Sequence, residues 1–270
     1  MTTRSTLLFN GFRGSGGEEC AARAPNGDAS SMPADTILTP VHPAASAART
    51  TFLVWHDIVP GEKLVWFDTT TGEFQSQVDA LARAGARPIP LDDAYRHLAS
   101  GAEVPAGACV LCFDDNTLGI YEHAFPLLRE RGWPFAVSAH TKYVGVTTGK
   151  AHCTWQQLRA MEATGLARVV SQTHTHPPDL RALGAQALRR EMWESKMRME
   201  HEMGRAARFL TYPSGKWDRR VALAAAEAGY RLGLTEDHGY TESSPHLLGL
   251  RRYSTHRRFA EAVRAVAARR

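Results

Sequence analysis

A run of six apolar residues, Ala108–Phe113, ends on two adjacent carboxylates, Asp114 and Asp115. Such a run suits a strand that is buried on both faces, as in a parallel sheet covered by helices. In these folds the loops at the carboxyl ends of the strands carry the chemistry, so one acid could hold a cation while the other acts as a general base. Asn116, which follows, tolerates a left-handed backbone. An Asp-Asp-Asn turn that merely ends a strand is equally compatible with these residue types.

Apolar stretches that read as strands alternate with segments of helical periodicity along the chain. The predicted strands are 52–55, 88–91, 108–113, 135–139, 167–170, 208–211, 230–234 and a short one near 248–250. The predicted helices are 71–86, 93–100, 121–131, 155–164, 184–204, 219–228 and one from 259 to the end. This order predicts an α/β fold, with a parallel sheet or barrel and crossover helices.

Length and composition limit the organisation of the chain. Its 270 residues suit one large α/β domain with a tail. Residues 1–50 are rich in small and polar residues and lack hydrophobic periodicity, which predicts a poorly ordered tail, and the domain is predicted over 51–270. The net charge of +4 is spread along the sequence and not gathered into a basic stripe, so we expect no nucleic-acid partner.

Two further patterns argue against other classes of protein. No run of 18 apolar residues is present, so no transmembrane segment is predicted, and the patch 7–9 is too short for the apolar core of a signal peptide. Cys109 and Cys112 have the Cys-x-x-Cys spacing of zinc and redox sites. Because they lie inside an apolar strand and no second pair exists, we interpret them as core residues.

His174 and His176 follow the predicted strand 167–170. Residues two apart on a strand point to one face, so both imidazoles could share an ion. With Asp115 they offer two nitrogens and one oxygen, which suits a catalytic zinc or similar divalent ion with one position open for water. The alternative of equal weight is that these histidines lie in a solvated loop.

Several short motifs occur in a fixed order between Thr51 and about His256. They are Trp55-His56, Cys112-Phe113-Asp114-Asp115-Asn116, the segment 171–177, Tyr212-Pro213-Ser214-Gly215 and Ala228-Gly229-Tyr230. Together they resemble the polysaccharide deacetylases of the NodB-homology type, carbohydrate esterase family 4, and most of all the branch that acts on poly-N-acetylglucosamine. The resemblance covers about three quarters of the chain.

The resemblance implies a distorted (β/α) barrel of about seven parallel strands. It also implies a hydrolase that removes N-acetyl groups from an amino-sugar polysaccharide with a divalent metal, zinc in the first place and cobalt or nickel as alternatives. The implied site consists of the base Asp114, the general acid His256, the metal ligands Asp115, Gln172 and His176, and the substrate-binding residues Tyr212, Pro213, Ser214 and Gly215. Family members usually act outside the cytoplasm, which implies the same location here although no export signal is visible.

Three positions depart from the pattern of this family. Gln172 replaces a histidine ligand, and an amide oxygen is a weaker ligand than imidazole for zinc-like ions. His174, or more distantly His140, could take over its role. Asn116 stands where glycine is frequent, and Thr211 stands where many members have an arginine that orients the base.

These departures keep two alternatives open. One is a catalytically impaired relative that binds a glycan through aromatic side chains, for which Trp155, Tyr212 and Trp217 are the candidates. The other is a metal-dependent hydrolase of a different amide or ester, because loops set substrate choice on such a fold. The expected partner in the main hypothesis is an N-acetylated polysaccharide.

Overall fold

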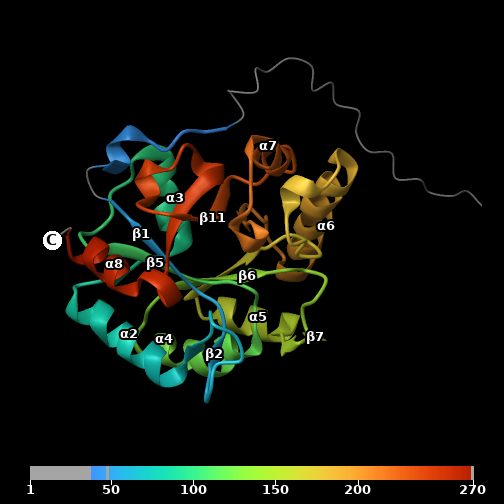
Figure 1. Ribbon diagram of the computed structural model, residues 1–270. Coiled ribbons are helices and arrows are strands. Elements are labelled where there is room, and N and C mark those ends of the chain that lie inside the picture. The colour runs from blue at the N-terminus through green and yellow to red at the C-terminus, as the bar shows by residue number, and fades with distance from the viewer. Residues whose placement is uncertain (1–37, 47–48, 269–270) are drawn as a thin grey trace, which may run out of the picture. The chain divides into compact units, whose positions relative to one another are not determined.

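The computed structural model describes residues 38–46 and 49–268 (Figure 1). The main sheet has eight strands in the order β1-β12-β11-β10-β9-β6-β5-β4, and β1 also pairs with β5. All of these pairings are parallel. The strands from β1 round to β5 therefore close into a seven-stranded barrel, and β4 is attached to β5 outside the ring. The predicted distorted (β/α) barrel is confirmed.

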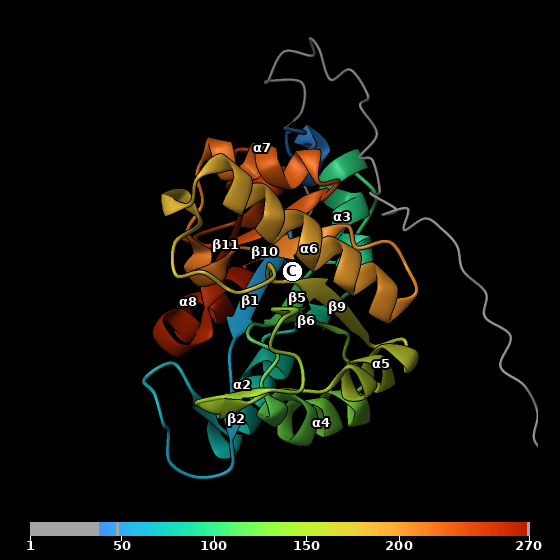
Figure 2. The ribbon, with the colours of Figure 1, turned by 90° about the vertical axis from the view of Figure 1, so that its right-hand side faces the viewer.

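The barrel is surrounded by helices, with α2, α4 and α5 on one side and α6 and α7 on the opposite side (Figures 1 and 2). The barrel strands are β1 (Thr51–Trp55), β5 (Ala108–Phe113), β6 (Phe135–Ala139), β9 (Ala167–Ser171), β10 (Phe209–Thr211), β11 (Leu232–His238) and β12 (Leu250–Ser254). The other strands are β2 (Ile58–Val59), β3 (Thr69–Thr70), β4 (Arg87–Pro88), β7 (Thr147–Thr148) and β8 (Lys150–Ala151). The α-helices are α2 (Thr71–Arg83), α3 (Leu91–Ser100), α4 (Phe125–Glu130), α5 (Trp155–Ala163), α6 (Ala185–Met203), α7 (Arg219–Glu227) and α8 (Thr255–Ala267).

Side chains of the barrel strands alternate between two apolar layers. On β5, Leu111 belongs to the layer shared with the helices, whereas Val110 belongs to the layer inside the barrel. Cys109 and Cys112 fall into different layers, so they cannot share an ion. Burial raises the pKa of both thiols to about 12, which leaves them uncharged. Their interpretation as core residues is confirmed.

Several element boundaries follow the local signals in the sequence. Helix α2 starts with a capping box between Thr70 and Glu73, and α6 ends at Gly204, whose φ of 64° only glycine adopts easily. Three predicted strands are displaced. The strand predicted at 88–91 is β4, Arg87–Pro88, and Leu91 already belongs to α3. The strand predicted at 230–234 is β11, two residues later, and the segment predicted near 248–250 is a 3₁₀ turn, Leu247–Gly249, that leads into β12.

The described part of the predicted tail packs on the barrel. The backbone N–H of His42 donates to the carbonyl of Leu98 on α3 (2.8 Å), and Ala45 is fully buried. Residues 1–37 and 47–48, to which the rest of the tail prediction applies, lie outside the described residues. Within residues 38–46 and 49–268, no helix combines the length and the hydropathy needed to cross a membrane.

Candidate active site

At the carboxyl ends of the barrel strands, the side chains that face the barrel interior change from apolar to polar. On β5, Val110 and Cys112 face the barrel interior, and Asp114 follows in the same alternation. The same step of two residues leads from Leu250 to Arg252 on β12. The residues reached in this way are His56, Asp114, Ser138, His140, Gln172, Thr211, Glu236 and Arg252. The carboxyl end of the barrel is therefore a polar, charged layer above an apolar one.

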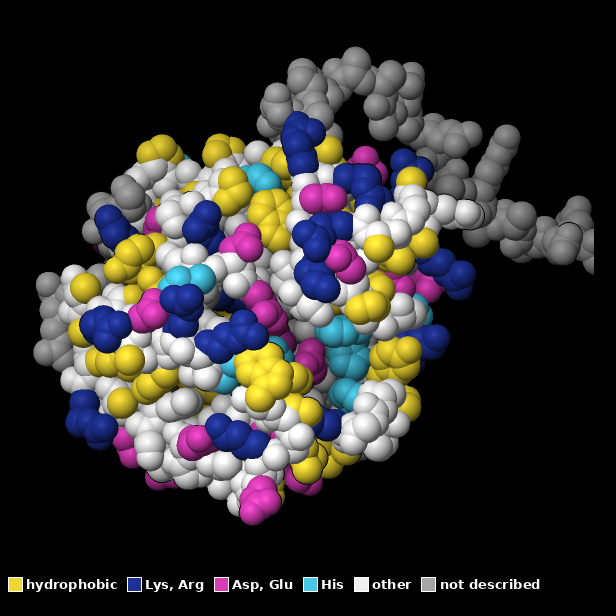
Figure 3. Space-filling model, viewed as in Figure 1, with side chains coloured by type: hydrophobic (Ala, Val, Ile, Leu, Met, Phe, Trp, Pro, Cys, Tyr) yellow, Lys and Arg dark blue, Asp and Glu magenta, His cyan; other side chains and the backbone are white. Residues whose placement is uncertain are grey.

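A cleft opens over this polar layer. It consists of two adjoining cavities of about 420 and 250 Å³, and both are lined by His56, Phe67, Asp115 and His176. Figure 3 shows histidine and acidic side chains side by side in a hollow on this face. The larger cavity is also lined by His140, Tyr143 and His152, and the smaller one by Gln172, Glu236 and His256.

Asp114 lies under the cleft and is only 2% exposed. Its Oδ1 accepts hydrogen bonds from Arg252 Nη1 (3.0 Å) and Ser138 Oγ (3.0 Å), and its Oδ2 accepts one from Arg252 Nη2 (2.7 Å). Burial alone would raise the pKa of Asp114, but the charge and hydrogen bonds of Arg252, with His56 and Ser138, hold it below its usual range. The group is therefore an ionised carboxylate, and Oδ2 keeps a lone pair that these hydrogen bonds do not use.

Arg252 is the residue that orients Asp114, and the sequence comparison with the family did not find it. Thr211, which occupies the family's arginine position, reaches the carboxylate only through Ser138, with 2.8 Å between the two hydroxyl oxygens. Arg252 comes from β12, is fully buried, and donates from Nε to the carbonyl of Thr235 (2.6 Å). The alternation from Leu250 along β12 would have placed its side chain inside the barrel.

His56 and Glu236 complete the Asp114 side of the cleft. Their ligand atoms and a carboxylate oxygen of Asp114 all lie within 4.8 Å of one another. Glu236 also lies against Gly215, where a β-carbon would come within 2.4 Å of the Glu236 backbone nitrogen. The three side chains could surround a cation by their types. However, the guanidinium of Arg252 already neutralises Asp114, and its charge would repel a divalent ion placed there.

Asp115 is turned away from Asp114 by a left-handed backbone. Asp115 has a φ of 71° and Asn116 a φ of 40°, which confirms the turn predicted at Asn116 and extends it by one residue. In the described chain, five residues other than glycine have positive φ, and all five lie at this end of the barrel: Asp115, Asn116, Thr173, His176 and Ser214. Backbone conformations of this cost concentrate at functional sites.

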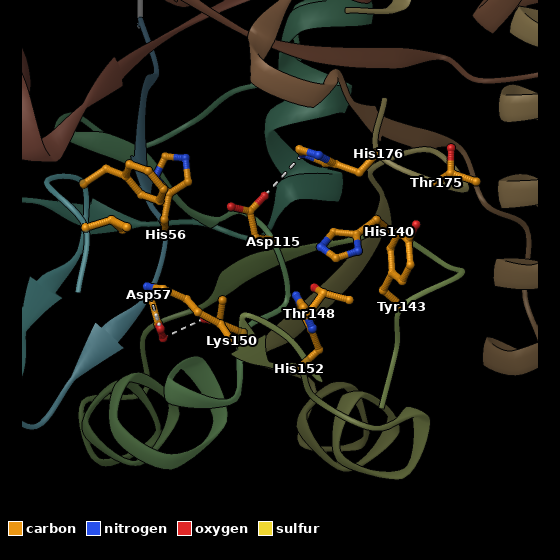
Figure 4. A pocket seen from close by; sticks show the side chains of 13 residues that line it. His56, Asp57, Asp115, His140, Tyr143, Thr148, Lys150, His152, Thr175 and His176 are labelled. Carbon is orange, nitrogen blue, oxygen red and sulfur yellow. Dashed lines mark hydrogen bonds and ion pairs between the residues drawn. The ribbon is translucent and has the colours of Figure 1, made fainter. Parts of the chain in front are cut away.

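Asp115, Gln172 and His176 are brought together at the boundary of the two cavities. Asp115 Oδ1 lies 3.5 Å from His176 Nε2, as the dashed line in Figure 4 marks. Gln172 Nε2 lies 2.9 Å from the same carboxylate oxygen and 3.3 Å from His176 Nε2. The amide orientation of Gln172 is fixed, because its Oε1 accepts the backbone N–H of Asp115 (2.8 Å). Gln172 therefore presents hydrogens, not a lone pair, to its two neighbours.

His174 is directed away from this group. Its Nδ1 lies 3.0 Å from Thr141 Oγ1, and its Nε2 lies 3.3 Å from Glu194 on α6. The loop is held by Glu191, which accepts the backbone N–H groups of His174 (3.0 Å) and Thr175 (2.8 Å). Glu191 was not predicted, although position 191 falls on the buried stripe of α6 and a carboxylate there needs partners.

His140 and His152 extend the histidine cluster into the larger cavity. The ring centroid of His140 lies 5.2 Å from that of His176 and 4.7 Å from that of His152. Its Nδ1 is buried and has no hydrogen-bond partner. Burial, and then repulsion by His176, lowers the pKa of His140 to about 4. His152 Nδ1 lies 2.6 Å from the carbonyl of Val146, and because a carbonyl only accepts, Nε2 carries the lone pair.

His256, the predicted general acid, does line the smaller cavity. Its ring lies 5.5 Å from that of His56 and 4.8 Å from that of Trp66, measured between centroids. Burial, followed by the charges of His56, Arg257 and Lys63, lowers its pKa to about 4. At neutral pH it is a neutral imidazole.

The predicted substrate loop contributes one residue to the cleft. Ser214 is exposed and lines the smaller cavity, whereas Tyr212, Pro213 and Gly215 are buried. The hydroxyl of Tyr212 donates to the carbonyl of Leu248 (2.8 Å), so it is not available to a ligand. None of the three aromatic residues named for the glycan-binding alternative lines the cleft. The aromatic residues Phe67, Trp66 and Tyr143 line the cleft instead, and Trp66 is 60% exposed.

Comparisons with known proteins agree with this architecture. The model of the family described as polysaccharide deacetylase matches residues 101–233. YxkH of Bacillus subtilis (strain 168), whose name assigns it provisionally to the polysaccharide deacetylases, is 26% identical over 206 residues, 76% of this chain and 71% of its own.

Solved structures share the fold at lower identity. IcaB from Ammonifex degensii has a TM-score of 0.73 at 23% identity, covering 82% of this chain and 97% of its own. The Streptococcus pyogenes deacetylase PplD, solved in complex with acetate, has a TM-score of 0.69 at 22% identity, covering 76% and 92%. The family match and the Bacillus relative agree with the resemblance to polysaccharide deacetylases that the sequence motifs indicate, and the solved structures share the barrel fold.

Proposed function

We propose that this chain removes N-acetyl groups from an amino-sugar polysaccharide, with Asp114 as the base and a divalent ion at Asp115 and His176. One observation carries the proposal. Two adjacent acids are separated into a buried, ionised carboxylate held by an arginine and a carboxylate paired with an imidazole, at the floor of one cleft. The first arrangement suits proton transfer, and the second suits a cation.

The donors at Asp115 and His176 fit a zinc-like ion. Two ligands of a tetrahedral ion with bonds of about 2.1 Å are roughly 3.4 Å apart. The observed separation of Asp115 Oδ1 and His176 Nε2 is 3.5 Å. When bound, such an ion supplies Lewis acidity, which polarises the acetyl carbonyl and lowers the pKa of water. Zinc is the ion we expect, with cobalt or nickel as substitutes.

Two side chains of the protein act as general base and general acid. Asp114 takes the proton of the attacking water on the lone pair of Oδ2, while Arg252 and Ser138 hold the carboxylate still. His256 lines the smaller cavity above Asp114 and delivers a proton to the departing sugar amine. Because its imidazole is neutral, His256 first takes up the proton that Asp114 accepted, by way of solvent water, and its low pKa then makes it a strong donor.

The loop after β10 offers one backbone donor for the developing oxyanion. The N–H groups of Tyr212 and Gly215 are occupied by the carbonyls of Leu234 (3.0 Å) and Tyr212 (2.8 Å). Pro213 has no N–H group, which leaves the N–H of Ser214, a residue that lines the cavity with a φ of 53°. We propose this N–H as the donor that faces the acetyl oxygen.

The test is acetate release from N-acetylglucosamine oligomers by the parent and by Asp114→Asn. Loss of a general base lowers rates by about 100- to 10,000-fold, so we expect a loss of roughly 1,000-fold in kcat with unchanged ion content. The control is Asp93→Asn on α3, which makes the same Asp-to-Asn change outside the cleft. Urea unfolding of each variant verifies that it is folded. An Asp114→Asn variant with the parental rate would refute the base assignment.

A further inference from the structure

We propose that His140 is the third protein ligand of the ion at Asp115 and His176, and that Gln172 positions Asp115 without binding the ion. This inference rests on the ion of the proposed function and concerns only which side chains bind that ion. It assigns a role to His140, which directly follows β6 and lies 32 positions before Gln172, the residue it would replace as a ligand.

Gln172 is committed to Asp115 at both ends of its amide. To offer its oxygen to an ion, the amide would have to rotate by about 180°. The Asp115 N–H would then lose its acceptor, now at 2.8 Å, and would face the NH₂ group of Gln172 instead. An unsatisfied donor of this kind costs about 1–3 kcal/mol. In its observed orientation the amide donates one hydrogen bond to the Asp115 carboxylate and accepts one from the Asp115 backbone N–H, so it positions this residue as an outer partner of a metal ligand does.

His140 has the properties that Gln172 lacks. It is 5% exposed and lines the larger cavity together with Asp115 and His176. Its Nδ1 is buried without a hydrogen-bond partner, which is uncommon for a buried polar atom. Figure 4 shows its ring beside Asp115 and below His176, on the same side of the cleft. The imidazole therefore lines the same cavity as Asp115 and His176, and its Nδ1 is buried without a hydrogen-bond partner.

The spacing of the two rings suits a shared ion. Imidazoles bound to one tetrahedral ion through bonds of about 2.1 Å have ring centroids roughly 5 Å apart. The centroids of His140 and His176 are 5.2 Å apart. His152 packs on His140 in a T-shaped contact and is itself fixed by the carbonyl of Val146, so it restricts the orientation of the His140 ring.

Two rival assignments fit less well. The group of His56, Asp114 and Glu236 is tighter, but the guanidinium of Arg252 holds both oxygens of Asp114. His174 shares its loop with His176, but its ring nitrogens face Thr141 and Glu194. By contrast, the ion-pair partner of Asp115 is the imidazole of His176.

The experiment measures ion binding without substrate. Zinc content of the purified protein is determined, and cobalt affinity is titrated through the visible absorption of bound Co²⁺, for the parent, His140→Ala, Gln172→Ala and His174→Ala. We expect one ion per chain in the parent, affinity lowered by more than about 100-fold in His140→Ala, by about 10- to 100-fold in Gln172→Ala, which removes the residue that positions Asp115, and by less than about threefold in His174→Ala. Weaker binding in Gln172→Ala with parental affinity in His140→Ala would overturn the proposal, and so would a parent that binds no ion.

A rescue variant separates ligand loss from damage to the fold. His140→Ala combined with Gln172→His restores an imidazole at the family position, and we expect it to regain the ion. If His140→Ala does not fold, His140→Asn is used instead, because it also removes the imidazole. Failure of the folded rescue variant to bind would count against the proposal. Because no substrate is present, ion binding that depends on His140 but brings no acetate release would refute the proposed function and leave this inference standing.

Discussion

The two acids that end β5 are neighbours in sequence and opposites in environment. Asp114 is 2% exposed and lies against the fully buried guanidinium of Arg252. The side chain of Asp115 is 25% exposed, and its partners are the imidazole of His176 and the amide of Gln172. Where the protein supplies the positive charge itself, the carboxylate stays ionised without a bound cation. Where only imidazole and amide surround it, a cation can supply the charge.

The largest effect is expected when Asp114 loses its ion-pair partner Arg252. Arg252→Met leaves a buried carboxylate without its counter-charge, which should lower the free energy of unfolding by about 3–5 kcal/mol in urea titrations. Asp114→Asn combined with Arg252→Met removes both charges and should recover a large part of this loss. If the single variant were as stable as the parent, the ion pair would not be what keeps Asp114 charged and in place.

Gln172→His tests how the surroundings of Asp115 determine its affinity for an ion. It replaces an amide that presents hydrogens with an imidazole that presents a lone pair, so cobalt affinity should rise by more than about tenfold. The parent, titrated in parallel, gives the reference. Equal affinities would mean that position 172 already contributes a ligand, against the assigned role of its amide.

A smaller effect is expected at His256, on the rim of the Asp114 side. His256→Asn should lower kcat by about tenfold and leave ion affinity unchanged, since this residue contacts neither Asp115 nor His176 in the described hydrogen bonds and ion pairs. The pKa of about 4 means that the protonated form is already lost below neutral pH. The kcat profiles of parent and variant between pH 6 and 9 should therefore run parallel, and a step in the parental profile alone would contradict this.

The smallest effect concerns acid stability. The pKa of Asp114 is lower in the folded chain than in the unfolded chain, so its ionisation favours folding above about pH 4. This contribution is lost as the pH falls through the folded-state pKa. In unfolding titrations from pH 7 to pH 3, the parent should lose more stability than Asp114→Asn. Parallel losses would mean that Asp114 is not charged in the folded protein.

Much of the barrel could be predicted because the relevant signals are local. The apolar run that ends at Phe113 and the acids after it predicted a strand and its functional end, and Gly204 marked the end of α6. His176 was also predicted, as a member of a short motif. These features depend on residues a few positions apart, which periodicity and motifs can capture.

The partners of these residues could not be predicted because they come from distant strands. Arg252 reaches Asp114 across 138 positions, and no motif marks it. The resemblance placed Gln172 in one site with Asp115, 57 positions away, but as a metal ligand and not as the hydrogen-bond partner that it is. The side chain of His174 turns outward because positive φ angles at Thr173 and His176 break the strand geometry that would have paired it with His176. His152 reaches the cleft on the hairpin of β7 and β8, which carries no motif. The localisation of the protein stays a prediction from the family resemblance.

The most direct test of the central claim is acetate release from N-acetylglucosamine oligomers by the parent as purified, after chelation, and after zinc or cobalt is returned. The account predicts release that chelation abolishes and the returned ion restores, with the protein folded throughout. Release that continues at the same rate in protein shown to be free of metal would contradict the role given to Asp115 and His176. A folded, ion-loaded protein that releases no acetate would contradict the proposed activity.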